Sequence, residues 1–215
     1  MNLNYFYWYF EKELTSKFCD KVISTALKRK KLLGITHEEE KIARKNKNLK
    51  RLSKKNLSDL KKIRDSNIVW MDDPWIYEVI TPYVNKANVN AGWNYHIDWT
   101  ESCQFTIYDK HQHYGWHVDS YKLPYNKPKN KKFHGKCRKL SVTISLSDPK
   151  DYKGGELELD FRNNNNGKPN LNICTEIKER GSIVVFPSYL WHRVKPVTSG
   201  TRYSLVLWNI GDPFK

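Results

Sequence analysis

Two His-x-Asp motifs lie close together in the stretch WNYHIDWTESCQFTIYDKHQHYGWHVDS, one at His96 and Asp98 and the other at His117 and Asp119. On a β-strand, side chains two residues apart point to the same side. An imidazole and a carboxylate held side by side can act as two ligands of one metal ion. Either pair can equally be the polar face of a half-buried strand, so the spacing alone does not identify a metal site.

The surroundings of the two pairs differ. His96 and Asp98 belong to a stretch that alternates polar and apolar residues. The apolar face of that stretch carries Trp93, Tyr95, Ile97 and Trp99. This pattern is typical of a half-buried strand without a site, so we expect no metal there. His117 and Asp119 are also the polar face of a predicted strand, and what distinguishes them lies downstream.

The segment GSIVVFPSYLWHRVKPVTSGTRYSLVLWNIG supplies a third candidate ligand and a cation. His192 follows a predicted buried strand and a proline turn. Arg202, ten residues later, begins another predicted strand, on which Ser204 and Trp208 share its face. A permanently charged, two-pronged guanidinium is well suited to binding a buried carboxylate. The second His-x-Asp pair therefore has the partners that a catalytic site requires.

An H-x-D pair, a distant His and an Arg about ten residues further on resemble the iron(II)- and 2-oxoglutarate-dependent dioxygenases, a double-stranded β-helix (jelly-roll) family. The likeness is greatest to the prolyl 4-hydroxylase (prolyl hydroxylase domain) branch. It covers most of the chain, including QFTIYDKHQHYGWHVD and SDPKDYKGGELEL. The resemblance implies that His117, Asp119 and His192 bind Fe(II), and that Arg202 binds the far carboxylate of 2-oxoglutarate. It also implies consumption of O2, release of succinate and CO2, and ascorbate as a reductant.

The same resemblance assigns residues around the cosubstrate and the substrate. Tyr108 and Ser204 are expected to bind 2-oxoglutarate, with Trp208 at the back of the cavity. The stretch IRDSNIVWM at 63–71 resembles a strand that brings an Arg and a Trp to the substrate mouth of oxygen-sensing prolyl hydroxylases. The residues expected to contact substrate are Arg64, Trp70, Tyr114 and Arg138. As a departure, Ile144 is expected where some relatives have a tyrosine that reaches the far carboxylate.

The elements that must position these residues are helices followed by short strands. Thr15-Ser16 precede an apolar stripe with helical spacing, and Asp73-Pro74 begin a second helix that Thr81-Pro82 should kink or restart. The apolar period then changes to two. The strand candidates are WNYHIDW, CQFTIYD, YGWHVD, KLSVTISLS, GELEL, GSIVVFP and TRYSLVLW. We therefore predict an α+β, mainly β fold with a jelly-roll core and N-terminal buttressing helices.

The chain length of 215 residues fits one catalytic domain, 1–215, with helical support from 1–88 and the jelly-roll core from 89–215. The four cysteines are scattered without a C-x-x-C pair, which predicts free thiols rather than a zinc or disulfide framework. No apolar run approaches the ~20 residues of a membrane span. The first residues lack the pattern of a secretory signal, so we expect a cytoplasmic chain. The pattern says nothing about oligomeric state.

The net charge of +15 is concentrated in two basic segments, 28–62 and 122–139. The first is expected to be a mobile loop or a poorly packed helix. The two segments are either a solvated surface or the contact site of an anionic partner. A nucleic-acid substrate is the weaker alternative to a proline-containing peptide, because Trp208 stands where nucleic-acid demethylases of this superfamily carry a second Arg. Another amino-acid side chain as target and a non-catalytic binding module are the remaining alternatives.

Overall fold

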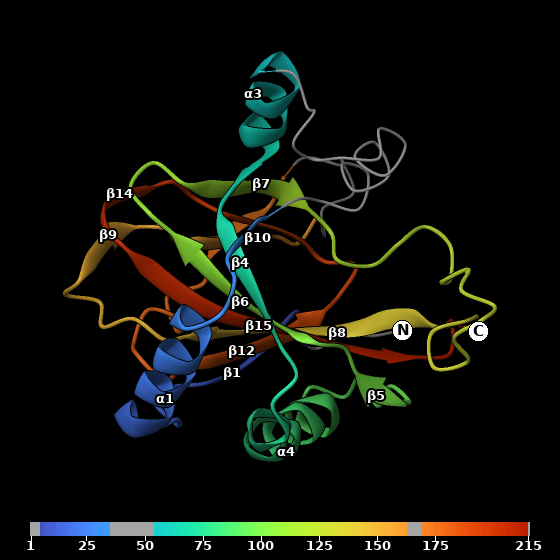
Figure 1. Cartoon of the computed structure of the whole chain (residues 1–215). Helices are drawn as coiled ribbons and strands as arrows, with labels where there is room; N and C mark the ends of the chain where they lie inside the picture. The colour runs from blue at the N-terminus through green and yellow to red at the C-terminus, as the bar shows by residue number, and fades with distance from the viewer. Residues whose placement is uncertain (1–4, 35–53, 163–168, 215) are drawn as a thin grey trace.

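Antiparallel strands in two sheets make up most of the molecule, with helices at its periphery (Figure 1). This computed structural model describes residues 5–34, 54–162 and 169–214, with the backbone alone for 54–57. The middle of the basic segment predicted to be mobile, 35–53, lies outside the described residues.

The larger sheet has eight strands, and all of its pairs are antiparallel. The strands of its main path follow one another in the order β1 (Trp8–Phe10), β12 (Ile183–Pro187), β8 (Cys137–Ser145), β15 (Arg202–Gly211), β6 (Cys103–Tyr108), β4 (Asn67–Met71) and β2 (Leu32–Leu33). The short strand β5 (Trp99–Thr100) pairs with β15 outside this path.

The smaller sheet has five strands, and a separate two-stranded ribbon lies beside it. The strands of this sheet follow one another in the order β11 (Leu171–Ile173), β10 (Leu157–Asp160), β13 (Trp191–Val194), β7 (His113–His117) and β3 (Arg64–Asp65). The ribbon pairs β9 (Tyr152–Gly154) with β14 (Val197–Gly200).

Two helices cover one face of the larger sheet. Helix α1 (Ser16–Leu27) begins after Thr15, whose hydroxyl accepts a hydrogen bond from the backbone N–H of Phe18 at 3.2 Å. Helix α4 (Pro74–Asn90) begins with a proline in its first turn, where a missing N–H is not needed. Their buried faces join one hydrophobic core with the sheet. The mainly β fold with buttressing N-terminal helices is thus confirmed, and a third helix, α3 (Lys54–Ile63), leads into β3.

The alternation of side chains on β15 divides the two faces of the large sheet. Leu205 and Leu207 point to the helices and are fully buried in the core. Arg202, Ser204 and Trp208 point the other way and line a cavity. The period-two pattern therefore separates a packing face from a chemical face on the same strand.

Two predicted details of secondary structure were wrong. The stretch WNYHIDW is irregular up to Asp98, because the Asn88 side chain bonds both the N–H and the C=O of Tyr95, at 3.0 and 2.8 Å. Asn94 adds a left-handed φ of 50°. Of the two outcomes predicted at Pro82, a kink or a restart, the restart is wrong, because α4 continues through this exposed residue.

No helix in the described ranges combines the length and apolarity that crossing a bilayer requires.

Candidate metal centre

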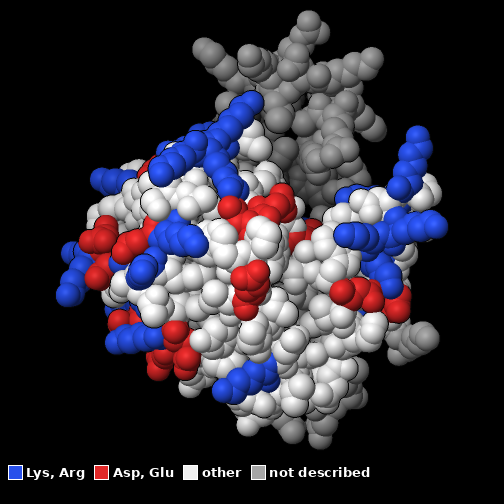
Figure 2. Space-filling model, turned by 60° about the horizontal axis from the view of Figure 1, so that its bottom comes forward, with Lys and Arg blue, Asp and Glu red and all other residues white. Residues whose placement is uncertain are grey.

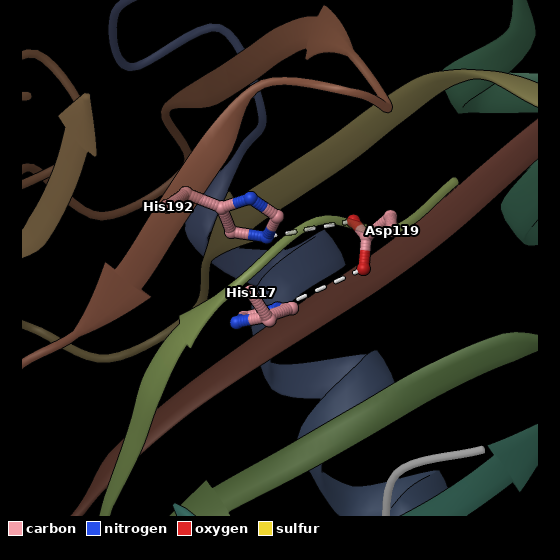
Figure 3. Close-up of side chains that lie close together, drawn as sticks. All are labelled: His117, Asp119 and His192. Carbon is pink, nitrogen blue, oxygen red and sulfur yellow. Dashed lines mark ion pairs between the residues drawn. The ribbon is translucent and has the colours of Figure 1, made fainter. Parts of the chain in front are cut away.

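Three predicted ligands meet where two strands of the smaller sheet pair. His117 ends β7, and the antiparallel register places it directly opposite His192 on β13. Asp119 follows two residues after His117, and its carboxylate faces both rings from one side (Figure 3). Its carboxylate oxygens are 3.7 Å from Nε2 of His117 and 3.5 Å from Nε2 of His192. One ligand atom from each residue lies within 4.8 Å of the others.

Both imidazoles are oriented by the backbone. Nδ1 of His117 lies 2.8 Å from the carbonyl oxygen of Gly115, and Nδ1 of His192 lies 2.9 Å from that of Leu190. A carbonyl can only accept, so each Nδ1 carries the proton and each Nε2 keeps its lone pair. The two lone pairs are therefore available on the side where Asp119 lies, as in metal-binding histidines held by an outer hydrogen bond.

Two hydrogen bonds fix Asp119 in place, one to its side chain and one from its backbone. The hydroxyl of Ser141 donates a 2.7 Å hydrogen bond to Oδ2, and the backbone N–H of Asp119 donates to the carbonyl of Ser188 at 2.9 Å. Burial alone would raise the pKa of Asp119, but the neighbouring His192, His117 and Arg138 and the Ser141 hydrogen bond lower it to about 2. The group is therefore ionised at neutral pH.

Burial has the opposite consequence for the imidazole of His117. Desolvation, and then the neighbouring His192, lower the pKa of His117 to about 3. A neutral imidazole and an ionised carboxylate are the forms that bind a metal ion. Two imidazoles and one carboxylate on one side of an ion leave the positions opposite them open, the arrangement of non-haem iron(II) sites.

The first His-x-Asp pair does not form a comparable site. His96 is exposed, and its Nδ1 is 3.5 Å from the carboxylate of Asp98. Together with Asp212 these residues form a second group of possible ligands, all of them exposed. Lys136 occupies that group with its ammonium, 2.7 Å from Asp98 and 2.8 Å from Asp212. The ammonium of Lys136 thus takes the place that a metal ion would need between these two carboxylates.

Beside the triad is a narrow, partly open cavity whose walls come from both sheets. Arg202 reaches this cavity from β15 and is only 3% exposed, yet its terminal nitrogen NH1 has no hydrogen-bond partner among the described residues. A buried guanidinium nitrogen without an acceptor is costly, and an anionic ligand would satisfy it. Tyr108 pairs opposite Arg202 in register and also lines the cavity, as does Ser204. These residues fit a small dicarboxylate such as 2-oxoglutarate.

Space for the Arg202 side chain depends on a glycine. Gly155 has a left-handed φ of 69°, and a Cβ added there would approach Cδ of Arg202 to 2.9 Å. Any larger residue would therefore be strained and would press on the guanidinium stem.

Ile144 does not take the position expected for it. It is fully buried on the helix-facing side of β8, in the main core. The residues beside it, Thr143 and Ser145, face the other way, and Ser145 pairs opposite Ser204. Ser145 also has a buried hydroxyl without a partner among the described residues. The counterpart of a carboxylate-binding side chain on this strand is therefore Ser145 or Thr143 rather than Ile144.

The two predicted tryptophans lie next to each other at the edge of the cavity. Their ring centroids are 6.2 Å apart; Trp208 is 6% exposed and lines the cavity, and Trp70 is 42% exposed. Trp70 is thus accessible to an incoming molecule, while Trp208 lies behind it.

Arg64 and Tyr114 form a stack behind one of the histidines. The ring of Tyr114 is nearly parallel to that of His117, with centroids 3.5 Å apart, and the Arg64 guanidinium lies 4.4 Å from the Tyr114 ring centroid. Arg64 is 5% exposed and its Nε donates to the Ser66 hydroxyl at 2.8 Å. Arg64, expected at the substrate mouth, is therefore buried behind Tyr114, because β3 pairs with β7 at this point.

Arg138, also expected to contact substrate, is engaged in a buried ion pair. Its guanidinium makes two hydrogen bonds of 2.8 Å to the Glu101 carboxylate, and the two side chains are 11% and 10% exposed. It also packs 3.9 Å from the Trp208 ring centroid, and its NH1 lies 3.4 Å from the Asp119 carbonyl. This geometry makes Arg138 a support for the triad rather than an open contact surface.

Several contributing residues were not predicted. Ser141 and Thr143 lie on the predicted strand KLSVTISLS, and its alternation could have placed them on the site face. Phe186, whose ring packs edge-on against His192 at 4.8 Å, could have been found in the same way on GSIVVFP. Glu101 lies just after the two-residue strand β5, which is too short for a periodic pattern to indicate that Glu101 reaches Arg138.

We expect His117→Ala to weaken binding of Fe(II), or of Co(II) as a probe, by at least about 100-fold, since even outer hydrogen-bond partners of ligands contribute 10–100-fold. His96→Ala is the matched control from the other motif and should bind the metal as the wild type does. Anaerobic calorimetry measures both affinities. A larger loss for His96→Ala than for His117→Ala would contradict the site.

Removing one member of the buried ion pair should destabilise the fold. Arg138→Leu leaves the Glu101 carboxylate buried without a counter-charge, so the free energy of unfolding should fall by about 3–5 kcal/mol, and adding Glu101→Leu should restore part of it. Lys62→Met, which removes an exposed pair with Asp59, should change it by less than about 1 kcal/mol. Denaturant titration measures all of these variants. Unchanged stability of Arg138→Leu, with loss of substrate use, would instead support the substrate contact.

Comparison with known proteins agrees with this geometry. Residues 103–209 match the sequence model of the 2OG-Fe(II) oxygenase superfamily. A PKHD-type hydroxylase of a Synechococcus species is 40% identical over 96 residues, which are 44% of this chain and 35% of that protein. The chain therefore matches little more than a third of the length of this curated relative.

Solved structures share the fold across nearly the whole chain. A prolyl hydroxylase from Trichoplax adhaerens, in complex with a hypoxia inducible factor oxygen degradation domain peptide fragment, has a TM-score of 0.66 and 18% identity, covering 96% of this chain and 84% of that one. A Pseudomonas putida prolyl-4-hydroxylase has a TM-score of 0.61 and 18% identity, with 96% and 93% covered. These likenesses confirm the jelly-roll fold. With its matching sequence region and its His-Asp-His group, this chain belongs to the 2OG-Fe(II) oxygenase superfamily.

Proposed function

We propose that this oxygenase hydroxylates prolyl residues, at C4, in a peptide or protein. His117, Asp119 and His192 hold Fe(II), and Arg202 binds the C5 carboxylate of 2-oxoglutarate. The observation that carries the oxygenase part is a buried triad of ligand atoms beside a buried arginine whose NH1 has no partner among the described residues. The prolyl substrate is supported by the named relatives, which include prolyl hydroxylases.

Iron(II) with 2-oxoglutarate and O2 supplies the chemistry that inserts an oxygen atom into an unreactive C–H bond and releases succinate and CO2. The residues of the chain orient and insulate these reactants. The Nδ1–H bonds to Gly115 and Leu190 keep both Nε2 atoms aimed at the ion, and the Ser141 hydroxyl holds the carboxylate of Asp119.

Arg202 fixes the orientation of the cosubstrate. Its guanidinium would hold the C5 carboxylate through the unpartnered nitrogen, and the hydroxyls of Tyr108 and Ser204, which also line the cavity, would add hydrogen bonds. Burial raises the pKa of Tyr108, so its hydroxyl stays protonated and can donate. Ser145, with its unpartnered hydroxyl, is a further donor on this face.

Trp70 and Tyr114 are the best-placed of the proposed substrate contacts, Trp70 through its exposed ring and Tyr114 through its position in the cavity wall. Arg64 and Arg138 act through the residues they support, Tyr114 and Trp208. We propose that residues 1–215 work as one cytoplasmic catalytic unit, with ascorbate as a reductant that restores iron(II).

Nucleic acid is the second candidate substrate, favoured by the net charge of +15. Nucleic-acid demethylases of this superfamily carry a second arginine at the position of Trp208. Here the Trp208 ring centroid lies 3.9 Å from the Arg138 guanidinium. The site therefore favours a peptide over nucleic acid as substrate.

We expect the iron-loaded protein to convert 2-oxoglutarate to succinate and to add the mass of one oxygen atom to proline-containing peptides from a library. Mass spectrometry locates the modification, and chromatography against 4- and 3-hydroxyproline standards identifies the carbon. Peptides with alanine in place of proline are the control. Succinate release that no proline peptide stimulates would contradict the prolyl assignment, and oxidation of a methylated oligonucleotide would favour the second candidate.

We expect Arg202→Lys to raise the KM for 2-oxoglutarate about ten- to hundredfold, since a lost charged hydrogen bond costs about 1.5–3 kcal/mol. Arg193→Lys is the matched control, because Arg193 lies on β13 and pairs with Glu158 at 2.6 Å, away from the cavity. Calorimetric titration with 2-oxoglutarate checks the binding directly. Equal losses in both variants would contradict the role of Arg202.

A further inference from the structure

The segment between β7 and β8 carries a surface of unpaired positive charge. Between Lys122 and Lys139 there are eight lysines and arginines and no acidic residue. Five of the lysines are exposed and make no ion pair to a described carboxylate. These five, which we call the lysine surface, are Lys122, Lys127, Lys129, Lys131 and Lys132. Blue side chains gather at the right of Figure 2, on the side where Figure 1 shows this segment.

The remaining cations of the segment are used internally. Arg138 is paired with Glu101, and Lys136 bridges Asp98 and Asp212. Lys139 is buried, with its ammonium 3.5 Å from the ring centroid of Phe214. The segment therefore separates its inward cations, which are paired or buried, from its outward lysines, which have no carboxylate partner among the described residues.

Both ends of the segment are anchored at the metal centre. It begins directly after Asp119, and it ends at Arg138, whose NH1 lies 3.4 Å from the Asp119 carbonyl. Near its middle, the hydroxyl of Tyr125 donates a 2.7 Å hydrogen bond to Glu101, the partner of Arg138. The segment that carries the lysine surface is thus tied to the metal centre through Tyr125 and Arg138.

Aromatic rings hold the lysine surface in shape. Phe133 packs edge-on against Tyr125 at 5.3 Å and against Trp99 at 4.6 Å. The ammonium of Lys127 lies 4.2 Å from the Phe133 ring centroid, and that of Lys132 lies 5.9 Å from the Trp99 centroid. Contacts between these ammonium groups and the rings limit the motion of the two side chains, so less entropy is lost when an anion binds.

On the basis of the proposed function, we propose that the peptide substrate is acidic next to its target residue, and that Asp or Glu side chains there bind the lysine surface. Charge complementarity of this kind speeds encounter and selects partners. The same rings argue against single-stranded nucleic acid, whose bases stack on open aromatic faces. Here Tyr125, Phe133 and Trp99 are packed against one another or covered by lysine ammonium groups.

Binding of labelled peptides to the full chain, loaded with Mn(II) and 2-oxoglutarate so that no turnover occurs, tests the proposal by fluorescence anisotropy. Three peptides share a central proline and carry flanking Glu, Gln or Lys. We expect the Glu peptide to bind about tenfold or more tightly than the Gln peptide, and the Lys peptide to bind most weakly. Added salt should reduce the difference, because exposed charges are screened.

Two charge-matched variants identify the surface responsible. Lys127→Glu/Lys129→Glu/Lys131→Glu should abolish the preference for the Glu peptide. Lys110→Glu/Lys150→Glu/Lys178→Glu changes the net charge equally but alters exposed lysines near β9, β11 and β14, so it should keep the preference. Circular dichroism checks that both variants fold.

Equal affinity for the Glu and Gln peptides, or equal loss in both variants, would overturn the proposal. Tighter binding of a labelled single-stranded oligonucleotide through the same three lysines would assign the surface to nucleic acid instead. Measuring hydroxylation distinguishes failure of the proposed function from failure of the proposed role of the lysine surface. If the Glu peptide binds through these lysines but no proline is oxidised, the proposed function fails and the lysine surface stands; proline oxidation without charge preference gives the reverse.

Discussion

The register between β7 and β13 is the constraint on which the site depends. It sets His192 opposite His117, and Asp119 reaches both rings because it follows β7 by two residues. A slip of one residue would turn every side chain of β13 to the other face of the sheet. The next strand, β10, fixes this register from the other side, with Leu159 fully buried opposite His192. Sheet pairing therefore places the two histidines, and Asp119 is placed by the chain that leaves β7.

Two buried arginines show how the fold separates support from ligand binding. Arg138 has its counter-charge built in, since Glu101 meets it with two hydrogen bonds of 2.8 Å. Arg202 is equally enclosed but has an unpartnered nitrogen among the described residues, and Gly155 leaves room for its stem. A charge that the chain has buried without satisfying it calls for an anion from outside. This contrast, with the place of Arg202 in the cavity wall, supports the proposed cosubstrate role of Arg202 and a supporting role for Arg138.

Most of the strands, and the residues that face the cavity from β15, could be predicted from the sequence, because both follow from the period-two alternation of side chains. Alternation placed Ser204 and Trp208 on the face of Arg202, and it located most of the strands. What escaped prediction depended on long-range contacts: the Glu101 partner of Arg138 and the burial of Arg64 behind Tyr114 follow from strand pairing that no local pattern encodes. The irregular stretch before Asp98 escaped because alternating burial of Trp93 and Tyr95 occurs there without a strand. Ile144 was misplaced by a single position on β8, which was enough to reverse its face.

The geometry of the site predicts one metal ion and one orientation of the cosubstrate, and both depend on the side chains that line the cavity. Crystals grown anaerobically with Mn(II) and 2-oxoglutarate, with anomalous scattering recorded from the manganese, test this directly. We expect a single strong peak bounded by His117, Asp119 and His192, with the far carboxylate of 2-oxoglutarate on Arg202. A peak at His96, Asp98 and Asp212, or density for 2-oxoglutarate that avoids Arg202, would contradict the account.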